Sequence, residues 1–225
     1  MIIPKGWIVV EYNDLIKKIS IINRKIKQKN YLPSGLYPII DQGKTFIGGY
    51  TNDQNKLLSC QMPVIVFGDH TKIVKFVDIN FAPGADGVKI IKPFEFFIPK
   101  LFFYFTKYLS KKIPDKGYSR HFQYLLKEKI PLPPLNEQNR IVEKIEELFS
   151  GLDKATEELE KVRKQLKIYR QSVLKAAFDG KLTDNESYDY LSFSKICDIN
   201  PPKKEISNTN GELEVTFLPM SLLTA

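Results

Sequence analysis

Residues 136–178, NEQNRIVEKIEELFSGLDKATEELEKVRKQLKIYRQSVLKAAF, decide the architecture of this 225-residue chain. Apolar residues recur along the stretch in alternating steps of four and three, an unbroken heptad pattern. The stretch contains no proline and a single glycine, Gly151. It therefore predicts one α-helix of roughly 60 Å, at a rise of 1.5 Å per residue. The apolar residues of this seam are Ile141, Ile145, Leu148, Leu152, Ala155, Leu159, Val162, Leu166, Tyr169, Val173 and Ala176.

The seam requires a partner surface. A repeat of 3.5 residues stays on one side of a helix only when that helix supercoils around another. Pairing within the chain is the alternative, but no second sequence of matching length and pattern is present. We therefore predict a coiled-coil dimer of two copies. The predicted dimerisation residues are Ile145, Leu148, Leu152, Leu159, Val162, Leu166, Tyr169 and Val173.

The net charge of +8 is unevenly distributed along the chain. Residues 1–135 carry 21 basic and 10 acidic residues, a net +11, whereas residues 136–178 carry 9 and 8, a net +1. Residues 179–225 carry 4 basic and 8 acidic residues, a net −4. A basic globule beside a neutral rod indicates a polyanionic partner, most often nucleic acid. The alternative is a solvated lysine-rich surface, because 29 of the 34 basic residues are lysine.

Three features of the sequence predict a cytoplasmic protein. No apolar run approaches the ~20 residues of a membrane span, and the first residues are too short and polar for a signal peptide. The two cysteines, Cys60 and Cys197, lie far apart with no ligand spacing, which favours reduced thiols.

The pattern along the chain predicts an α+β fold. Short apolar runs bounded by turn residues predict strands at 64–67, 73–77 and 88–91, and residues 99–110 read as a buried helix. Prolines make residues 130–135 an extended hinge, after which Asn136 is the expected N-cap of the long helix and Gly180 its C-terminal cap. The predicted domains are a mixed α/β globule at 1–135, a dimerising helix at 136–180, and at 181–225 a partial second domain.

Three loops carry the residues expected to contact DNA. Residues 111–121 form a basic loop with an aromatic residue, residues 42–50 have glycines that permit close approach, and residues 69–72 form a polar turn. Basic side chains reach phosphates, and arginine pairs with guanine in the major groove. The alternative in each case is a solvated loop. The predicted DNA-binding residues are Gln42, Lys44, His70, Lys72, Lys112, Lys116, Tyr118, Arg120 and His121.

Catalysis and metal binding are not expected from this sequence. Neither His70 nor His121 has a cysteine or histidine at ligand spacing. Residues 200–203 (NPPK) are similar to the Asn-Pro-Pro-aromatic loop of adenine methyltransferases, but lysine replaces the aromatic residue that stacks on a flipped base. No glycine-rich cofactor loop follows a strand upstream, so we expect this chain to bind no cofactor and no metal.

Three segments resemble a known family. Residues 130–138 (IPLPPLNEQ), 140–142 (RIV) and 172–182 (SVLKAAFDGKL) are similar to the central conserved region of type I restriction-modification specificity subunits. Residues 67–71 (FGDHT) and 84–88 (GADGV) resemble turns of one class of target recognition domain in that family. The tail, with residues 199–203 and 215–220, resembles the opening of a second recognition domain.

The resemblance implies a non-catalytic, sequence-specific DNA-recognition subunit. In this family two recognition domains each read half of a split site on double-stranded DNA, and two antiparallel helices set the spacing. Methyltransferase and restriction subunits bind to the specificity subunit and carry S-adenosylmethionine, ATP and Mg. One recognition domain and one helix imply a half-subunit that dimerises with itself in an antiparallel manner and reads an inverted repeat.

Two other functions remain open from the sequence. The chain is an adaptor if the helix binds partner helices and the lysines only confer solubility. It is a decayed fragment of a full-length subunit if the tail has lost its domain. Salt-dependent binding to duplex DNA distinguishes DNA recognition from an adaptor function. A monodisperse dimer excludes a decayed fragment.

Overall fold

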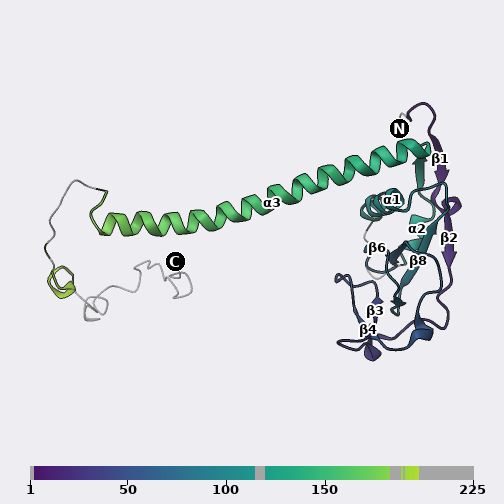
Figure 1. The fold of residues 1–225 in the computed structure, drawn as a ribbon, viewed down its shortest axis with the longest axis horizontal. Helices are drawn as coiled ribbons and strands as arrows, with labels where there is room; N and C mark the ends of the chain where they lie inside the picture. Colours follow the sequence, from purple (N-terminus) through teal and green to yellow (C-terminus); the bar gives the residue numbers. More distant parts are fainter. Residues whose placement is uncertain (1–2, 115–119, 183–188, 190, 198–225) are drawn as a thin grey trace, which may run out of the picture. The chain divides into compact units, whose positions relative to one another are not determined.

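The computed structural model describes residues 3–114, 120–182, 189 and 191–197 (Figure 1). The chain divides into two units, residues 1–157 and 158–225. The strands are β1 (Ile8–Glu11), β2 (Ile16–Ile19), β3 (Tyr37–Ile40), β4 (Gly49–Thr51), β5 (Val64–Gly68), β6 (Val74–Val77), β7 (Ala82–Pro83), β8 (Val88–Pro93) and β9 (Lys129–Leu132). The α-helices are α1 (Pro99–Lys112), α2 (Phe122–Leu125) and α3 (Leu135–Phe178). Short 3-10 helices span Tyr12–Leu15, Gln28–Asn30, Gln54–Lys56 and Phe193–Lys195.

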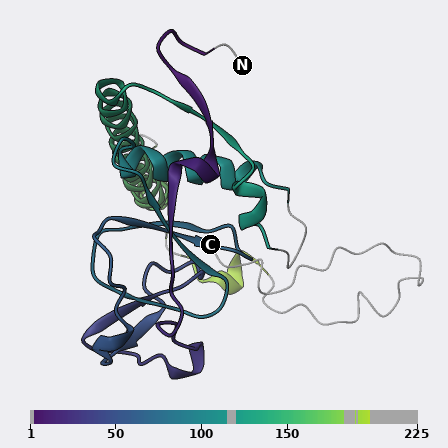
Figure 2. The same cartoon turned by 90° about the vertical axis from the view of Figure 1, so that its right-hand side faces the viewer.

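The strands that the structure describes form three sheets. The largest has the order β2-β8-β5-β6 and is antiparallel throughout. A second sheet has the order β4-β3-β7, with β3 antiparallel to β4 and parallel to β7, and the third is the antiparallel pair β1-β9. The N-terminal segment, purple in Figures 1 and 2, contributes β1 to one sheet and β2 to another. We call these strands together with α1 and α2, residues 3–134, the globule.

The central strand β5 is buried on both of its faces, as its apolar run predicts. Because successive side chains of a strand point to opposite faces, the residues of β5 divide between two clusters. Ile65 and Phe67 belong to the cluster that includes Phe102 of α1, whereas Val64 and Val66 belong to the cluster around Phe81. The four-stranded sheet therefore separates two apolar cores within one globule, and the predicted α+β fold is confirmed.

Helix α1 covers one face of the sheet. Pro99 occupies its first turn, where the missing N–H has no helical partner to lose, and Leu101, Phe102 and Leu109 are buried. Inside this layer the hydroxyl groups of Tyr12 and Thr106 form a hydrogen bond of 2.8 Å. Both residues are fully buried, so the hydrogen bond satisfies polar groups that would otherwise destabilise the core.

The long helix begins one residue earlier than the sequence predicts. The N–H groups of Glu137 and Gln138 both donate to the carbonyl oxygen of Pro134, at 2.9 and 3.0 Å, so Pro134 holds the N-cap position. The prediction of Asn136 as the N-cap is therefore wrong, and Leu135 is helical instead of extended. Proline has fixed φ and no donor, so it suits a position that only has to accept hydrogen bonds.

Gln138 fastens the start of α3 to the globule. It is 1% exposed, and its side-chain nitrogen donates to the carbonyl oxygens of Phe96 and Pro133, each at 3.0 Å. Its side-chain oxygen accepts from the N–H of Ile98 at 2.8 Å. One amide side chain thus pairs three backbone groups from two segments of the globule.

The first part of the seam packs against the globule itself. Ile141 and Ile145 lie against the core cluster that contains α1, and Glu146 forms an ion pair of 3.2 Å with Lys100 of α1. Ile145, predicted as a dimer contact, therefore packs on the core of its own chain. The exposed part of the seam begins at Leu148.

Beyond the globule the seam is uncovered. Leu152, Leu159 and Leu166 are 62%, 69% and 53% exposed. Within the part of the chain that the structure describes, no helix is apolar over enough length to cross a membrane. The long helix therefore carries a solvated apolar stripe among charged faces.

Gly180 ends α3, as predicted. It has a φ of +69°, a left-handed conformation that glycine adopts without the steric cost of a Cβ. Its N–H donates to the carbonyl oxygen of Ala177 at 3.1 Å, and the N–H of Lys181 donates to that of Ala176 at 2.8 Å. These two hydrogen bonds are a Schellman motif, which satisfies the last carbonyl groups of the helix. The tail segments 199–203 and 215–220, which resemble the opening of a second recognition domain, lie outside the described residues.

Candidate nucleic-acid interface

Three regions of the sequence meet at the end of β5. The loop 41–48 joins β3 to β4, and the turn 69–72 joins β5 to β6. Gln42 in the loop accepts from the turn twice: its side-chain oxygen accepts from the N–H of His70 at 3.3 Å, and its carbonyl oxygen accepts from the Thr71 hydroxyl at 2.8 Å. The third region enters at His121, whose N–H donates to the Asp69 carbonyl oxygen at 2.8 Å. We call loop 41–48, turn 69–72 and residues 120–121 the three-loop surface.

Asp69 is the residue that ties these regions together. It is 3% exposed, and one carboxylate oxygen accepts from the N–H of Phe122 at 2.8 Å. The other carboxylate oxygen lies 3.6 Å from the Lys89 ammonium of β8. The N–H of Asp69 donates to the Gly87 carbonyl oxygen at 2.6 Å. A buried carboxylate is stable only with such partners, so Asp69 holds the entry to α2 against the turn.

His121 has a structural role in this arrangement. It is fully buried, and its ring Nδ1 lies 2.9 Å from the carbonyl oxygen of Asp69. The prediction that His121 contacts DNA directly is therefore wrong, because its side chain has no exposed surface. The sequence placed Asp69 in the polar turn 69–72 but did not predict its buried role, although a charged residue directly after a fully apolar strand was a usable signal.

Glycines permit the close approach of these loops. A Cβ on Gly68 would clash with the Thr71 hydroxyl and lie 2.8 Å from Cβ of Gln42. Gly87 has a φ of +72°, and a Cβ there would lie 2.6 Å from Cδ2 of His70. Any larger residue at either position would push the loops apart.

The remaining predicted contact residues differ in accessibility. Lys44, Lys112 and Arg120 are exposed, and the Lys112 ammonium lies 4.5 Å from the centre of the Tyr108 ring. Lys72 is half-buried, and its ammonium donates to the carbonyl oxygen of Ile113 at 3.3 Å, which links the turn to the end of α1. Gln42 and His70 are half-buried. Lys116 and Tyr118 lie outside the described residues.

The charges of this surface differ in burial. The carboxylates of Asp41 and Asp69 lie 3.6 Å from the ammonium groups of Lys75 and Lys89, respectively. The cations Lys44 and Arg120 are exposed, as is Lys112 at the end of α1. This arrangement suits an extended anion such as a phosphate backbone. No group of three or more His, Cys, Asp or Glu side chains able to hold a metal ion occurs among the described residues.

Two solved structures share this fold, an α+β domain followed by a long helix. The HsdS subunit from Thermoanaerobacter tengcongensis aligns over 80% of this chain and 46% of its own, with a TM-score of 0.58 and 18% identity. A chain from a study of complex assembly and conformational transition of the type I R-M system aligns over 79% of this chain and 47% of its own. Its TM-score is 0.64 and its identity is 18%.

The match to a family model identifies the chain more closely. Residues 4–167 match the type I restriction modification DNA specificity domain, and the chain belongs to that family. This confirms the resemblance seen in the sequence. The family is one of DNA-specificity components and not of catalysts, in agreement with the expected absence of catalysis.

Two curated relatives are much longer than the region that matches this chain. It is 28% identical over 160 residues to the EcoR124I/EcoR124II specificity subunit of Escherichia coli, covering 66% of this chain and 40% of the relative. It is 26% identical over 206 residues to the StySPI specificity subunit of Salmonella potsdam, covering 80% of this chain and 44% of the relative. The chain thus spans about two fifths of the length of these relatives.

Proposed function

We propose that this chain is the sequence-specific DNA-recognition subunit of a type I restriction-modification system. The observation that carries the proposal is the convergence of separately predicted DNA-binding loops on one surface, in a chain of the DNA specificity family. The recognition domain comprises residues 1–135, the dimerising helix residues 136–180, and the start of a second recognition domain residues 181–225. The three-loop surface reads one half of a split site.

The exposed seam supports self-association. Its leucines point into solvent over several turns, and an apolar stripe of this length marks an interaction surface. The structure describes no second helix of comparable length in this chain that would cover the stripe. A second copy supplies a matching stripe, with Leu148, Leu152, Leu159, Val162, Leu166, Tyr169 and Val173 in the contact.

The charges of α3 favour an antiparallel pair. Residues 135–160 carry three basic and eight acidic residues, a net −5, whereas residues 161–178 carry six basic residues and no acidic one, a net +6. Antiparallel pairing places the acidic half of each helix beside the basic half of the other. Parallel pairing places like charges together, which weakens association.

Such a dimer has consequences for the DNA site and for the partners. Two identical recognition domains related by a twofold axis read an inverted repeat. In the proposed complex the chain positions methyltransferase subunits and, through them, restriction subunits on cytoplasmic DNA. S-adenosylmethionine, ATP and Mg bind to those partner subunits, and the methylation and cleavage chemistry takes place there.

Methylation mapping tests the proposal directly. The chain is co-expressed with its cognate modification subunit in a methylation-free host, and adenine methylation is mapped by long-read sequencing. A new split palindromic motif is the expected result. A split asymmetric motif would retain DNA recognition and exclude the homodimer, and no new motif from a soluble, co-purifying complex would contradict the proposal.

Salt-dependent binding tests which lysines contact phosphates. Each phosphate contact contributes about 1 to the slope of log affinity against log salt concentration. Lys44→Met and Lys112→Met are each expected to lower this slope by about 1. Lys17→Met is the matched control, because Lys17 pairs with Glu95 and lies opposite Lys92 of β8, away from the turn 69–72.

A protein adaptor is the second candidate function, favoured by the exposed seam alone. In that case purified complexes would contain a different partner helix on α3, and binding to duplex DNA would be weak at every salt concentration. The two assays above separate this function from DNA recognition.

A further inference from the structure

A lysine is buried beneath loop 41–48. Lys75 lies on β6, an edge strand of the four-stranded sheet, and is only 6% exposed. By the alternation of a strand it shares a face with Val77, which packs in the cluster around Phe81. A position of this kind ordinarily holds an apolar residue, because burying a charge costs free energy unless it is paired.

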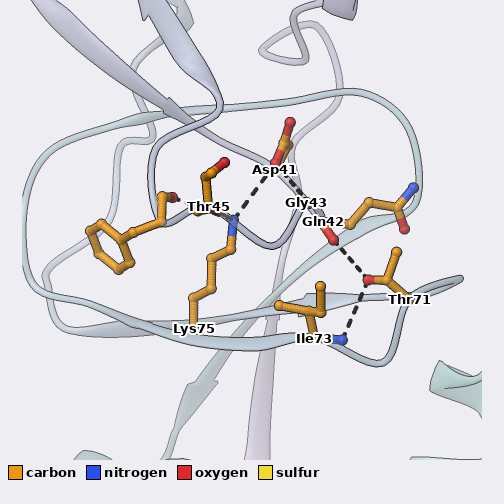
Figure 3. Close-up of polar contacts among 8 residues, drawn as sticks. Asp41, Gln42, Gly43, Thr45, Thr71, Ile73 and Lys75 are labelled. Carbon is orange, nitrogen blue, oxygen red and sulfur yellow. Dashed lines mark hydrogen bonds and ion pairs between the residues drawn. The ribbon is translucent and has the colours of Figure 1, made fainter. Parts of the chain in front are cut away.

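The polar partners that the structure describes for the Lys75 ammonium all belong to loop 41–48. It donates to the carbonyl oxygen of Thr45 at 2.6 Å and to that of Phe46 at 3.3 Å, and it lies 3.6 Å from a carboxylate oxygen of Asp41 (Figure 3). Figure 3 shows the lysine side chain rising from its strand toward the inside of the loop. A single cation therefore binds both the start and the middle of the loop.

Asp41 shapes the loop from within. The carboxylate oxygen nearest Lys75 also accepts from the N–H of Gly43 at 2.8 Å, which closes a tight turn. Space around the carboxylate is limited: a Cβ on Gly48 would lie 2.8 Å from Cγ of Asp41, and one on Gly84 would lie 2.6 Å from its Cβ. The loop is consequently folded around the Asp41–Lys75 pair.

A second attachment holds the same loop from the side. The Thr71 hydroxyl donates to the Gln42 carbonyl oxygen at 2.8 Å and accepts from the N–H of Ile73 at 3.4 Å (Figure 3). This attachment reaches only the start of the loop. The carbonyl groups of Thr45 and Phe46, farther along, depend on Lys75.

The environment of Lys75 is costly for a cation. Burial lowers the pKa of its ammonium group, and the neighbouring Asp41 carboxylate acts in the opposite direction. An apolar side chain of similar length would avoid the desolvation, but it would leave the two loop carbonyl oxygens and Asp41 without this donor. The charge is thus explained by the loop that it supports.

We propose that Lys75 is a positioning residue that fixes the geometry of loop 41–48 for reading DNA sequence, without touching DNA itself. The inference rests on the proposed DNA-recognition function. Its physical basis is that reading base edges requires donors and acceptors at defined positions, whereas attraction to phosphates does not. Lys44, exposed on the loop, is the cation that meets DNA.

The test compares Lys75→Met with Lys44→Met in the full chain assembled with its modification subunit. The probes are a duplex with the mapped motif and a duplex of scrambled sequence, over a series of salt concentrations. Lys75→Met is expected to weaken binding to the motif roughly 5- to 150-fold, the effect of one mismatched base pair. Its binding to the scrambled duplex and its salt slope should stay unchanged, whereas Lys44→Met lowers the slope by about 1.

Two further variants distinguish loss of the Asp41–Lys75 pair from a general loss of folding. Lys75→Arg retains a cationic donor and is expected to recover part of the discrimination between the two duplexes. Asp41→Asn removes the carboxylate beside Lys75, retains an acceptor for the N–H of Gly43, and should reduce discrimination as Lys75→Met does.

Three results would overturn the inference. A fall of about 1 in the salt slope of Lys75→Met would show that the lysine contacts phosphate. Unchanged discrimination in a folded Lys75→Met or Asp41→Asn variant would show that the loop does not need the pair. Failure of the wild-type complex to distinguish the two duplexes would contradict the proposed DNA-recognition function itself. The first two results would contradict only the role of Lys75.

Discussion

The globule and the outer part of α3 contain the same apolar residue types, but the globule buries them and α3 exposes them. In the globule Phe67, Phe102 and Leu125 are completely buried. On α3, Leu159 and Leu166 are 69% and 53% exposed. The globule therefore obtains its hydrophobic stabilisation from its own chain, whereas the exposed part of the seam, from Leu148 onward, gains such stabilisation only where another surface covers it.

The boundary between the two behaviours lies within a single helix. Ile141 and Ile145 follow the same heptad pattern as Leu148 and Leu152, but they pack against the core cluster of α1. The heptad pattern thus serves two purposes: its first part joins the helix to the globule, and the remainder is available to a partner.

Shortening a seam leucine is expected to have the largest effect, and it acts on association and not on the globule. Truncating a buried leucine to alanine costs about 2–5 kcal/mol, and a homodimer contains each site twice, so Leu159→Ala should raise the dissociation constant by about a thousandfold or more. Sedimentation measures the proposed dimer, and the fluorescence of Trp7, the single tryptophan, follows unfolding of the globule. An unweakened dimer in Leu159→Ala would show that the exposed seam is not the contact between the two copies. Lys154→Ala, on the same helix outside the seam, is the control.

A matched pair of phenylalanine substitutions tests the burial difference itself. Phe102 is fully buried and Phe178 is 86% exposed. Phe102→Ala is expected to lower the free energy of unfolding of the globule by about 3–5 kcal/mol, because it leaves a cavity in a packed core. Phe178→Ala should change it by less than about 0.5 kcal/mol. Urea denaturation measures both, and equal effects would refute the division between the two regions.

Gln138 lies at the joint between the regions, and its loss should have an intermediate effect. Gln138→Ala leaves the N–H of Ile98 and the carbonyl oxygen of Phe96 without their partner, at a cost of about 1–3 kcal/mol. Asn139→Ala removes an exposed amide one residue later and should change stability by less than about 0.5 kcal/mol. Thermal unfolding of the two variants decides the matter, and similar midpoints would show that Gln138 does not hold the joint.

Periodicity in the sequence was sufficient to predict the elements with the strongest pattern. The run 64–67 is the buried strand β5, the residues 99–110 lie in α1, and the heptads lie in α3. Gly180 was also predictable, because the left-handed end of a helix strongly favours glycine. In these cases local spacing and local backbone geometry decide the structure.

The predictions that failed depend on contacts between distant residues. His121 looked like part of a basic loop, but the carbonyl oxygen of Asp69, 52 residues earlier, holds it inside the globule. No role was predicted for Lys75, because it lies in an apolar strand pattern and its partner Thr45 is 30 residues earlier in the sequence. The predicted cap at Asn136 was plausible locally, but the preceding prolines set the start of the helix. Spacing alone does not identify such partners.

Substitution of Gly151 is expected to have the smallest effect. It tests how closely a partner helix approaches α3. Gly151 lies within α3, and a Cβ placed on it would meet nothing within 4 Å in this chain. Glycine within a helix is less stable than alanine by about 0.5–1 kcal/mol, so Gly151→Ala should stabilise the isolated helix by that amount. In the heptad Gly151 directly precedes Leu152 and flanks the seam, where an added methyl group meets a close partner helix first. The thermal midpoint and the dissociation constant of the dimer are measured for this variant. A higher midpoint together with a tighter dimer would show that the partner leaves space at this position. A gain in stability with a weaker dimer would place Gly151 at the closest approach of the two helices.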